Sequence, residues 1–227
     1  MNGAALFVKL LEEQGTDVVF GYPGGTVLSI YDALYKERRR IRHIRTAHEQ
    51  GAAHAADGYA RVSGKTGVCI ATSGPGATNL VTGIANAYMD SVPVVFVTGN
   101  VPLPLIGTDS FQEVDITGIT LSVTKHNFMV KAPEELAPCL RAAFQIANTG
   151  RKGPVLVDIP RDILEMKMPA GSDLGHALPM RSKQIPEVDL VRLEEAVSLI
   201  DASKRPPILA GGGSRSAGAD GILLELA

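Results

Sequence analysis

Residues 67–76 read Gly67-Val68-Cys69-Ile70-Ala71-Thr72-Ser73-Gly74-Pro75-Gly76. The first six residues form a short and largely apolar run, which is typical of a β-strand buried on both faces. The next four form a glycine-rich turn. A helical pattern at residues 77–89 and a second apolar run at residues 92–97 follow the turn. This order of elements predicts a β-α-β unit with two parallel strands.

The alternation of helix and strand continues on both sides of this unit. The spacing of apolar residues predicts further helices at residues 3–13, 27–37, 49–62 and 133–148. It predicts further strands at residues 17–20, 41–45 and 153–160. Strands rich in β-branched residues need helices on each face of the sheet. We therefore expect an α/β fold, with a doubly wound, mostly parallel sheet and helices on both faces.

The regular pattern stops after residue 166, where a Pro-, Gly- and Ser-rich stretch begins. Such a composition is typical of a linker. Residues 188–227 predict a helix, a strand at residues 206–210 and one further helix, too little for a parallel sheet to close its own core. We predict a domain at residues 1–166, a linker at 167–187 and the incomplete start of a second α/β domain at 188–227. The chain would then be a piece of a larger protein.

Composition and charge narrow the range of partners. The chain has 227 residues, 45% of them hydrophobic, and a formal net charge of −2. A nearly neutral chain has no field to hold nucleic acid or an anionic membrane. The basic run is interpreted as a solvated helix end, and it consists of Lys36, Arg38, Arg39, Arg40 and Arg42.

The cysteines and the hydropathy pattern indicate a compartment. Cys69 and Cys139 form no C-x-x-C pair and suit a reducing environment. No apolar stretch approaches the ~20 residues needed to span a bilayer, and the N-terminus shows no signal pattern. We predict a soluble, cytoplasmic protein that binds neither nucleic acid nor membrane.

Three loops follow predicted strands, and ligands of doubly wound sheets bind beyond the carboxyl ends of the strands. The segments are Gly21-Tyr22-Pro23-Gly24-Gly25, Ser73-Gly74-Pro75-Gly76-Ala77-Thr78-Asn79 and residues 99–113, which include Phe111, Gln112 and Glu113. Glycines permit close backbone approach to a flat ligand. Each loop is also consistent with an ordinary turn. The pair Lys125-His126 fits either acid–base chemistry or a structural imidazole.

Glu49 begins the predicted helix at residues 49–62, and its neighbours are mostly Ala and Gly. Small neighbours let another surface pack closely, which would remove water from the carboxyl group. An acid that loses its water keeps or shares a proton more readily. Such a group can hydrogen-bond a heterocyclic nitrogen. The alternative is a glutamate stabilised by the helix dipole in the first turn.

Five segments together resemble, in order and spacing, the N-terminal pyrimidine-binding domain of thiamine diphosphate enzymes, most closely the acetolactate synthases. They are Gly21-Tyr22-Pro23-Gly24-Gly25, His48-Glu49-Gln50-Gly51-Ala52, residues 72–79, residues 107–113 and Thr124-Lys125-His126-Asn127. The resemblance covers residues 3–227. The first three segments are shared with decarboxylases, oxidases and other carboligases of the superfamily.

The resemblance implies roles for individual residues. Glu49 matches the glutamate that hydrogen-bonds N1′ of the cofactor's aminopyrimidine, so that the cofactor's own amino group can remove the thiazolium C2 proton. The activated cofactor would then join two 2-oxo acids with loss of CO2. Gln112 matches a donor to the substrate, and Phe111 matches a position near the reacting carbon. The positions that match the cofactor lining are Tyr22, Pro23, Gly24, Gly25, Thr72, Pro75 and Asn79.

Two positions depart from the commonest acetolactate synthase pattern. Arg161 stands where Lys is more frequent, and Asn100 stands where Gln is usual. Both match positions near the substrate channel, which leaves the acceptor 2-oxo acid open. The family's middle domain also binds FAD, and Arg151 and residues Gly211, Gly212 and Gly213 match its contacts.

The family binds the cofactor's diphosphate through Mg2+, using a third domain with a Gly-Asp-Gly…Asn segment. This chain has no such segment, so no metal ligands are assigned. In the family that domain comes from a neighbouring subunit, which implies a homodimer or tetramer, and a regulatory subunit is a further expected partner. We therefore expect this chain alone to be inactive and to bind thiamine diphosphate weakly.

Other functions remain open at this stage. The nearest is another thiamine diphosphate-dependent 2-oxo acid decarboxylase or oxidase. A second is a non-catalytic interaction module on the same fold. A generic nucleotide-binding domain is disfavoured because no loop has the spacing that cradles phosphate.

Overall fold

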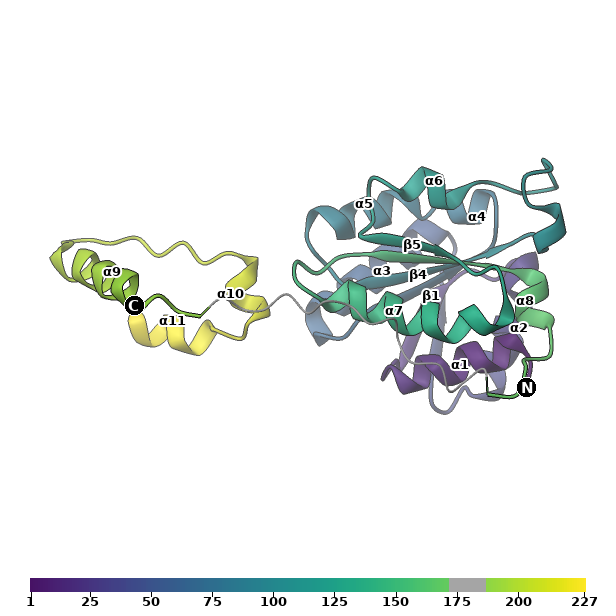
Figure 1. Cartoon of the computed structure of the whole chain (residues 1–227), viewed down its shortest axis with the longest axis horizontal. Helices are drawn as coiled ribbons and strands as arrows, with labels where there is room; N and C mark the ends of the chain where they lie inside the picture. The colour runs from purple at the N-terminus through teal and green to yellow at the C-terminus, as the bar shows by residue number, and fades with distance from the viewer. Residues whose placement is uncertain (172–186) are drawn as a thin grey trace. The chain divides into compact units, whose positions relative to one another are not determined.

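Six parallel strands form the sheet of the first of two compact units. The computed structural model describes residues 1–171, in this unit, and residues 187–227, in the second (Figure 1). The strand order is β2-β1-β3-β4-β6-β5. The strands are β1 (Val18–Gly21), β2 (Arg42–Arg45), β3 (Gly67–Ala71), β4 (Val94–Asn100), β5 (His126–Met129) and β6 (Val155–Pro160).

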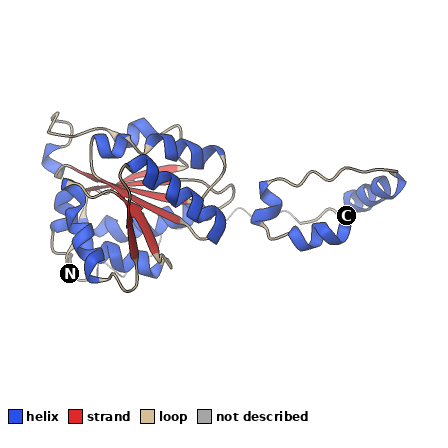
Figure 2. Cartoon of the chain, turned by 180° about the vertical axis from the view of Figure 1, so that it is seen from behind, coloured by secondary structure: helices blue, strands red, loops and turns tan. Residues whose placement is uncertain are grey.

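Side-chain alternation along the strands divides the core into two layers. Phe20, Cys69, Phe96 and Leu156 are paired in register across the sheet and lie in one buried cluster. Their neighbours Val68, Val95 and Val155 lie in the other cluster. Because both faces are apolar, helices must cover both faces, and Figure 2 shows the strands between two helical layers. The predicted doubly wound α/β fold is confirmed.

The helices divide between the two faces. The first cluster includes residues of α3 (Glu49–Ser63), α4 (Pro75–Thr78), α5 (Val81–Met89) and α6 (Ile116–Thr120). The second includes residues of α1 (Gly3–Glu13), α2 (Leu28–Lys36), α7 (Leu136–Asn148) and α8 (Arg161–Glu165). Short 3₁₀ turns are η1 (Gly25–Val27), η2 (Leu103–Leu105) and η3 (Pro133–Glu135).

The structure differs from the predicted elements at two places in the first unit. The helix expected at residues 77–89 is divided into α4 and α5, with Asn79 at the end of the first. The strand β5 was not predicted, because its mixture of polar and apolar residues lacks the signature of a buried strand. It lies at the edge of the sheet, where only β6 pairs with it and burial is partial.

The basic run is exposed, as predicted. The helix α2 ends at Lys36, which forms an ion pair with Asp32 at 2.7 Å. Arg40 lies beyond the helix and pairs with Glu12 at 3.0 Å. Arg42 continues the run into the edge strand β2. Within the described residues, no helix has the length and apolar character needed to cross a membrane.

The second unit contains α9 (Leu190–Ala202), α10 (Gly212–Ser216) and α11 (Asp220–Leu226). The strand predicted at residues 206–210 is wrong, because this segment has no strand assignment. A strand needs a neighbour to receive its backbone hydrogen bonds, and the described part of this unit offers none. No described residue of the unit is buried.

The linker predicted at residues 167–187 lies mostly outside the described residues, which omit 172–186. Its first two residues belong to the first unit. Lys167 forms a β-bridge with Asn2, and Met168 is 8% exposed in the core cluster beside α1. The domain boundaries themselves stay a prediction.

Candidate active site at the strand ends

Because the strands are parallel, the first two predicted loops and the start of α3 all lie at the carboxyl ends of the strands. The loop at residues 21–25 follows β1, and residues 72–79 follow β3. The neighbouring strand β2 leads into α3, whose first residue is Glu49. The side chain of His48 caps this helix by accepting the Gln50 N–H at its Nδ1, at 3.1 Å. The cap fixes the point where the helix begins and therefore the place of Glu49.

Glu49 is a buried acid, with 8% of its surface exposed. Asn79 donates from Nδ2 to its Oε2 at 2.9 Å. Its other oxygen, Oε1, has no hydrogen bond within the described residues, and no described cation forms an ion pair with it. Glu49 therefore presents one free acceptor with no positive side chain to neutralise it.

Two glycines allow the first two loops to pack closely beside this acceptor. A Cβ added to Gly76 would lie 2.7 Å from Thr72 Cγ2 and 3.3 Å from Glu49 Oε1. A Cβ added to Gly24 would lie 2.5 Å from the Thr72 side chain. Any larger residue would fill the region between the first two loops. We call this close contact of the two loops beside Glu49 Oε1 the cradle; the partner that this oxygen lacks is a hydrogen-bond donor, such as the N–H of a heterocycle.

Thr26 joins the first two loops, and sequence reasoning did not find it. Its hydroxyl lies 2.9 Å from the Thr72 hydroxyl and accepts the Ser73 N–H at 3.1 Å. The Thr26 N–H donates to Thr72 Oγ1 at 3.3 Å. The available signal was a hydroxyl residue directly after the glycine turn, but its partners are 46 and 47 positions away.

The third predicted loop reaches the second through Gln112. A Cβ on Gly74 would lie 2.7 Å from the Gln112 carbonyl oxygen, so the two backbones are in close contact. Gln112 has a φ of 58°, which is unusual for a residue other than glycine. Phe111 is 85% exposed. Tyr22 and Pro23 lie on the first loop and Pro75 begins α4 in the second, so the cofactor-lining positions predicted in the first unit lie in these two loops.

A second buried carboxylate, Asp158, was also missed. It is fully buried on β6 and accepts from Thr98 Oγ1 and Asn100 Nδ2, each at 2.6 Å. Burial raises its pKa to about 6, and the charge of Asp115 adds to this, although both hydrogen bonds oppose the shift. A polar residue near the end of an apolar parallel strand was the available signal.

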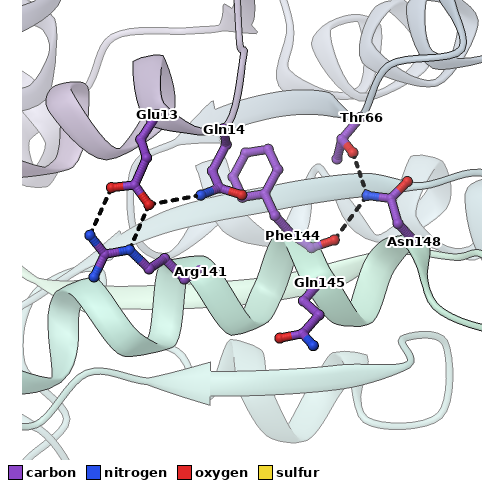
Figure 3. A pocket seen from close by; sticks show the side chains of 7 residues that line it. All are labelled: Glu13, Gln14, Thr66, Arg141, Phe144, Gln145 and Asn148. Atoms are coloured by element: carbon purple, nitrogen blue, oxygen red, sulfur yellow. Dashed lines mark hydrogen bonds and ion pairs between the residues drawn. The ribbon is translucent and has the colours of Figure 1, made fainter. Parts of the chain in front are cut away.

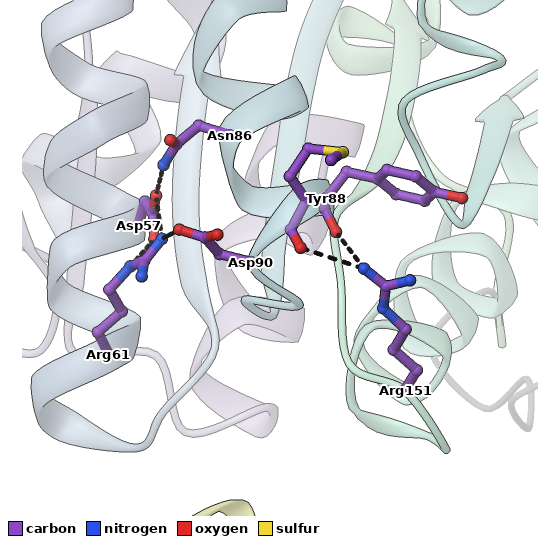
Figure 4. Close-up of polar contacts among 7 residues, drawn as sticks. Asp57, Arg61, Asn86, Tyr88, Asp90 and Arg151 are labelled. Atoms are coloured by element: carbon purple, nitrogen blue, oxygen red, sulfur yellow. Dashed lines mark hydrogen bonds and ion pairs between the residues drawn. The ribbon is translucent and has the colours of Figure 1, made fainter. Parts of the chain in front are cut away.

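Arg151 lies at the opposite ends of the strands from this site. It comes before β6, at the amino ends of the strands, and Figure 4 shows it against the end of α5. It donates to Ser91 Oγ at 2.7 Å and to the Met89 carbonyl at 3.1 Å. Gly211, Gly212 and Gly213 belong to the second unit and are exposed. The structure therefore does not bring the predicted FAD contacts together within one unit.

Two further predicted groups are engaged elsewhere. Arg161 forms an ion pair with Glu165 at 2.7 Å on the exposed side of α8. His126 lies on the edge strand β5 with its ring against Phe128, at 4.4 Å between centroids. The neighbouring Lys125 donates to the Thr149 carbonyl at 2.7 Å, and burial lowers the pKa of its amine. Lys125 therefore links the start of β5 to the end of α7, while His126 packs within β5.

A hollow of about 460 Å³ lies at the other end of the strands, at their amino ends, where α1 and α7 end (Figure 3). Arg141 crosses it to form an ion pair with Glu13 at 2.7 Å. Asn148 donates to Thr66 Oγ1 at 2.7 Å on its other side. These partners satisfy one another, and the hollow is separate from the Glu49 site. The described residues contain no group of three or more His, Cys, Asp or Glu side chains that could hold a metal ion.

The fold and this site define a class, namely a doubly wound α/β domain with its ligand crevice at the strand ends. Residues 1–119 match the family model described as the thiamine pyrophosphate enzyme, N-terminal TPP binding domain. The chain belongs to the thiamine pyrophosphate enzyme family. The matched residues include Glu49, Asn79 and both glycines of the cradle.

Relatives that are similar over nearly the whole chain are larger proteins. The probable acetolactate synthase large subunit of Methanocaldococcus jannaschii is 51% identical and covers 100% of this chain and 38% of its own length. The acetolactate synthase large subunit of Corynebacterium glutamicum is 52% identical, with 94% and 34% covered. The isozyme 2 large subunit of Escherichia coli K12 is 50% identical, with 94% and 38% covered. The chain thus spans a little over a third of the length of these relatives.

Proposed function

We propose that this chain is the pyrimidine-binding part of an acetolactate synthase, which joins two 2-oxo acids in branched-chain amino acid biosynthesis. Pyruvate is the expected donor, with loss of CO2. The names of the relatives at about half identity support a synthase over a decarboxylase or oxidase. Family membership supports thiamine diphosphate as the cofactor.

The observation that carries the proposal is the state of Glu49. It is a buried acid with one oxygen held by Asn79 and the other free beside Gly76. Oε1 itself is not fully buried, so a ligand can reach it, and no described residue donates to it. An aminopyrimidine ring that offers an N–H would supply that donor.

The residues of this chain would bind and orient the cofactor, while thiamine diphosphate supplies the carbanion chemistry. Glu49 Oε1 would hold a proton at the ring nitrogen N1′. Asn79 would keep the carboxyl group from turning away, and Gly24 and Gly76 would let the ring approach. Gln112 would donate a hydrogen bond to the substrate from the third loop.

Further parts of the proposal come from the resemblance alone. Mg2+ would be bound through a further domain, and FAD through the middle domain. The enzyme would be a cytoplasmic homodimer or tetramer with a regulatory subunit. Arg151 in this structure is engaged with the end of α5, so a contact with FAD would require it to change partners.

Glu49→Gln in the full-length protein tests the proposal. The amide cannot share a proton with the ring in the same way, so acetolactate formation from pyruvate should fall by about a hundredfold or more. Glu134→Gln is the matched control, because Glu134 is exposed on η3. Equal activity in wild type and Glu49→Gln would refute the assignment. Release of acetaldehyde in place of acetolactate by the wild type would favour a decarboxylase.

A further inference from the structure

Asp158 is a buried acid that the proposed reaction does not use. Its side chain is 0% exposed, and no described Lys, Arg or His pairs with it. Both of its oxygens accept a hydrogen bond, Oδ1 from Thr98 and Oδ2 from Asn100. A fully satisfied buried carboxylate offers nothing to a ligand, so its role must act through its donors.

The hydrogen bonds around Asp158 have a fixed direction. A carboxylate only accepts, whereas an amide both donates and accepts. Asp158 therefore requires the Nδ2 of Asn100, which leaves Asn100 Oδ1 to accept the Val101 N–H at 2.8 Å. The carboxylate thus determines the orientation of the Asn100 amide, and the amide holds the backbone of Val101.

Val101 is the first residue of the 101–115 loop, which leads from β4 to α6 and carries Gln112. The start of the loop has a second anchor, because Asp162 accepts the Leu103 N–H on both oxygens at 3.2 Å. Asp158 and Asp162 both come from the end of β6 and the start of α8. The same junction therefore holds two consecutive points of the loop.

The far part of the loop is closed on itself and rests on the crevice. Glu113 accepts the N–H groups of Gly107 and Ser110. Gln112 lies against Gly74, in the turn that also carries Gly76. A shift at Val101 would therefore be transmitted to a segment that contacts the crevice.

We propose that Asp158 is a positioning residue that, acting through Asn100, fixes the start of the 101–115 loop and thereby the place of Gln112. Its effect on the loop follows from the contacts of this chain alone. Its effect on catalysis rests on the proposed function.

Exchanging the hydrogen-bond donor and acceptor between positions 100 and 158 tests the proposal. In Asn100→Asp, the side chain at position 100 has no N–H to donate, so a second carboxylate faces Asp158 and one oxygen of Asp158 loses its donor. The double variant Asp158→Asn/Asn100→Asp exchanges donor and acceptor. The amide at position 158 then donates to the carboxylate at position 100, which still accepts the Val101 N–H.

Hydrogen–deuterium exchange of this chain provides the measurement. In Asn100→Asp the amides of residues 101–113 should exchange about tenfold faster, which corresponds to about 1.4 kcal/mol. The double variant should return to within about threefold of the wild type. If Asn100→Asp does not fold, Asn100→Ala decides, because it breaks the same link without adding a second charge. It should accelerate the same amides.

Asp57→Asn is the matched control. Asp57 is also a buried carboxylate, 3% exposed, and it accepts from Asn86 and Arg61 between α3 and α5 (Figure 4). Its loss should accelerate exchange in those helices and leave residues 101–113 unchanged. The proposal is overturned if the double variant exchanges as fast as Asn100→Asp, or if acceleration in Asn100→Asp or Asn100→Ala is absent or spread evenly over the chain.

Activity of the full-length enzyme separates this inference from the proposed function. Asn100→Ala should raise KM for the 2-oxo acid severalfold while the concentration of thiamine diphosphate needed for half-maximal activity stays the same. An unchanged KM would limit Asp158 to a structural role and overturn its link to Gln112. If the wild type forms no acetolactate, the proposed function fails, and the exchange data still decide the role of Asp158 in the loop.

Discussion

The Glu49 region and the Asp158 region each contain a buried carboxylate near the carboxyl ends of the strands, yet they satisfy it differently. Glu49 has one donor and one free oxygen beside glycines. Asp158 has a donor for each oxygen and no exposed surface. Under the proposed function the free acceptor would bind a ligand, whereas the satisfied acid would hold the scaffold. Burial alone would not have distinguished the two regions.

Besides Glu49→Gln, the largest effect is expected where the free oxygen is covered. Gly76→Ala adds a methyl group 2.7 Å from Thr72 Cγ2 and 3.3 Å from Glu49 Oε1. The methyl group forces Thr72 to move and occupies the space in front of the carboxylate. Acetolactate formation by the full-length protein should fall about a hundredfold, or about 2.8 kcal/mol.

Gly58→Ala is the control for this change, because Gly58 is exposed on α3 and a Cβ there has no neighbour within 4 Å. It should keep nearly full activity. If Gly76→Ala were as active as Gly58→Ala, the space beside Glu49 Oε1 would not be used by the cofactor, and the contrast between the two carboxylates would lose its functional meaning.

The protonation of Asp158 should make the free energy of unfolding depend on pH. Burial raises the pKa of Asp158 from 3.8 to about 6. The folded state therefore binds the proton more tightly, so this group's contribution to stability is complete below about pH 4 and is lost as the pH rises through 6. Between pH 4.5 and 7 the loss amounts to about 2 kcal/mol.

Urea unfolding of this chain at both pH values measures that loss. Asp158→Asn has no titrating group at the site, so the difference between wild type and variant should change by this amount over the interval. A constant difference between wild type and Asp158→Asn would show that Asp158 does not take up a proton in the folded protein.

The sequence was sufficient for the layers of the fold because each buried strand is an apolar run between turn residues. The edge strand β5 has no continuous apolar run and was therefore not predicted. Residues 206–210 have an apolar run, but no neighbouring strand pairs with them. The composition of a segment indicates only which of its residues would be buried. Pairing depends on which other segments are present, and that information lies outside the segment.

The candidate site, like the fold, could be predicted from the sequence only in part. Glu49, Asn79 and the glycines stand in short motifs, so their proximity followed from the parallel strand order. Thr26 and Asp158 act through partners at least 46 positions away in the chain. A lone threonine or aspartate at a strand end has many equivalents in the sequence, and only the register of the sheet selects its partner.

A smaller effect is expected for the donor that holds Glu49. Asn79→Ala removes the hydrogen bond to Oε2, so the carboxyl group gains freedom to turn away from the crevice. Activity of the full-length protein should fall about tenfold, or about 1.4 kcal/mol. Asn148→Ala is the control, since Asn148 donates to Thr66 at the other end of the strands. Equal losses in the two variants would point to general destabilisation.

The smallest effect concerns the link between the first two loops. Thr26→Val keeps the shape of the side chain but removes the oxygen that contacts Thr72 and accepts the Ser73 N–H. The free energy of unfolding should decrease by about 1 kcal/mol.

Thr78→Val is the matched control, because the exposed Thr78 hydroxyl bonds only to the carbonyl of Pro75, three residues earlier. It should change stability by less than about 0.5 kcal/mol. If urea unfolding gave the same small change for both variants, the two hydroxyls of Thr26 and Thr72 would not hold the loops together. The cradle beside Glu49 would then depend on backbone packing at Gly24 and Gly76, and Gly24→Ala would become the variant that separates the loops.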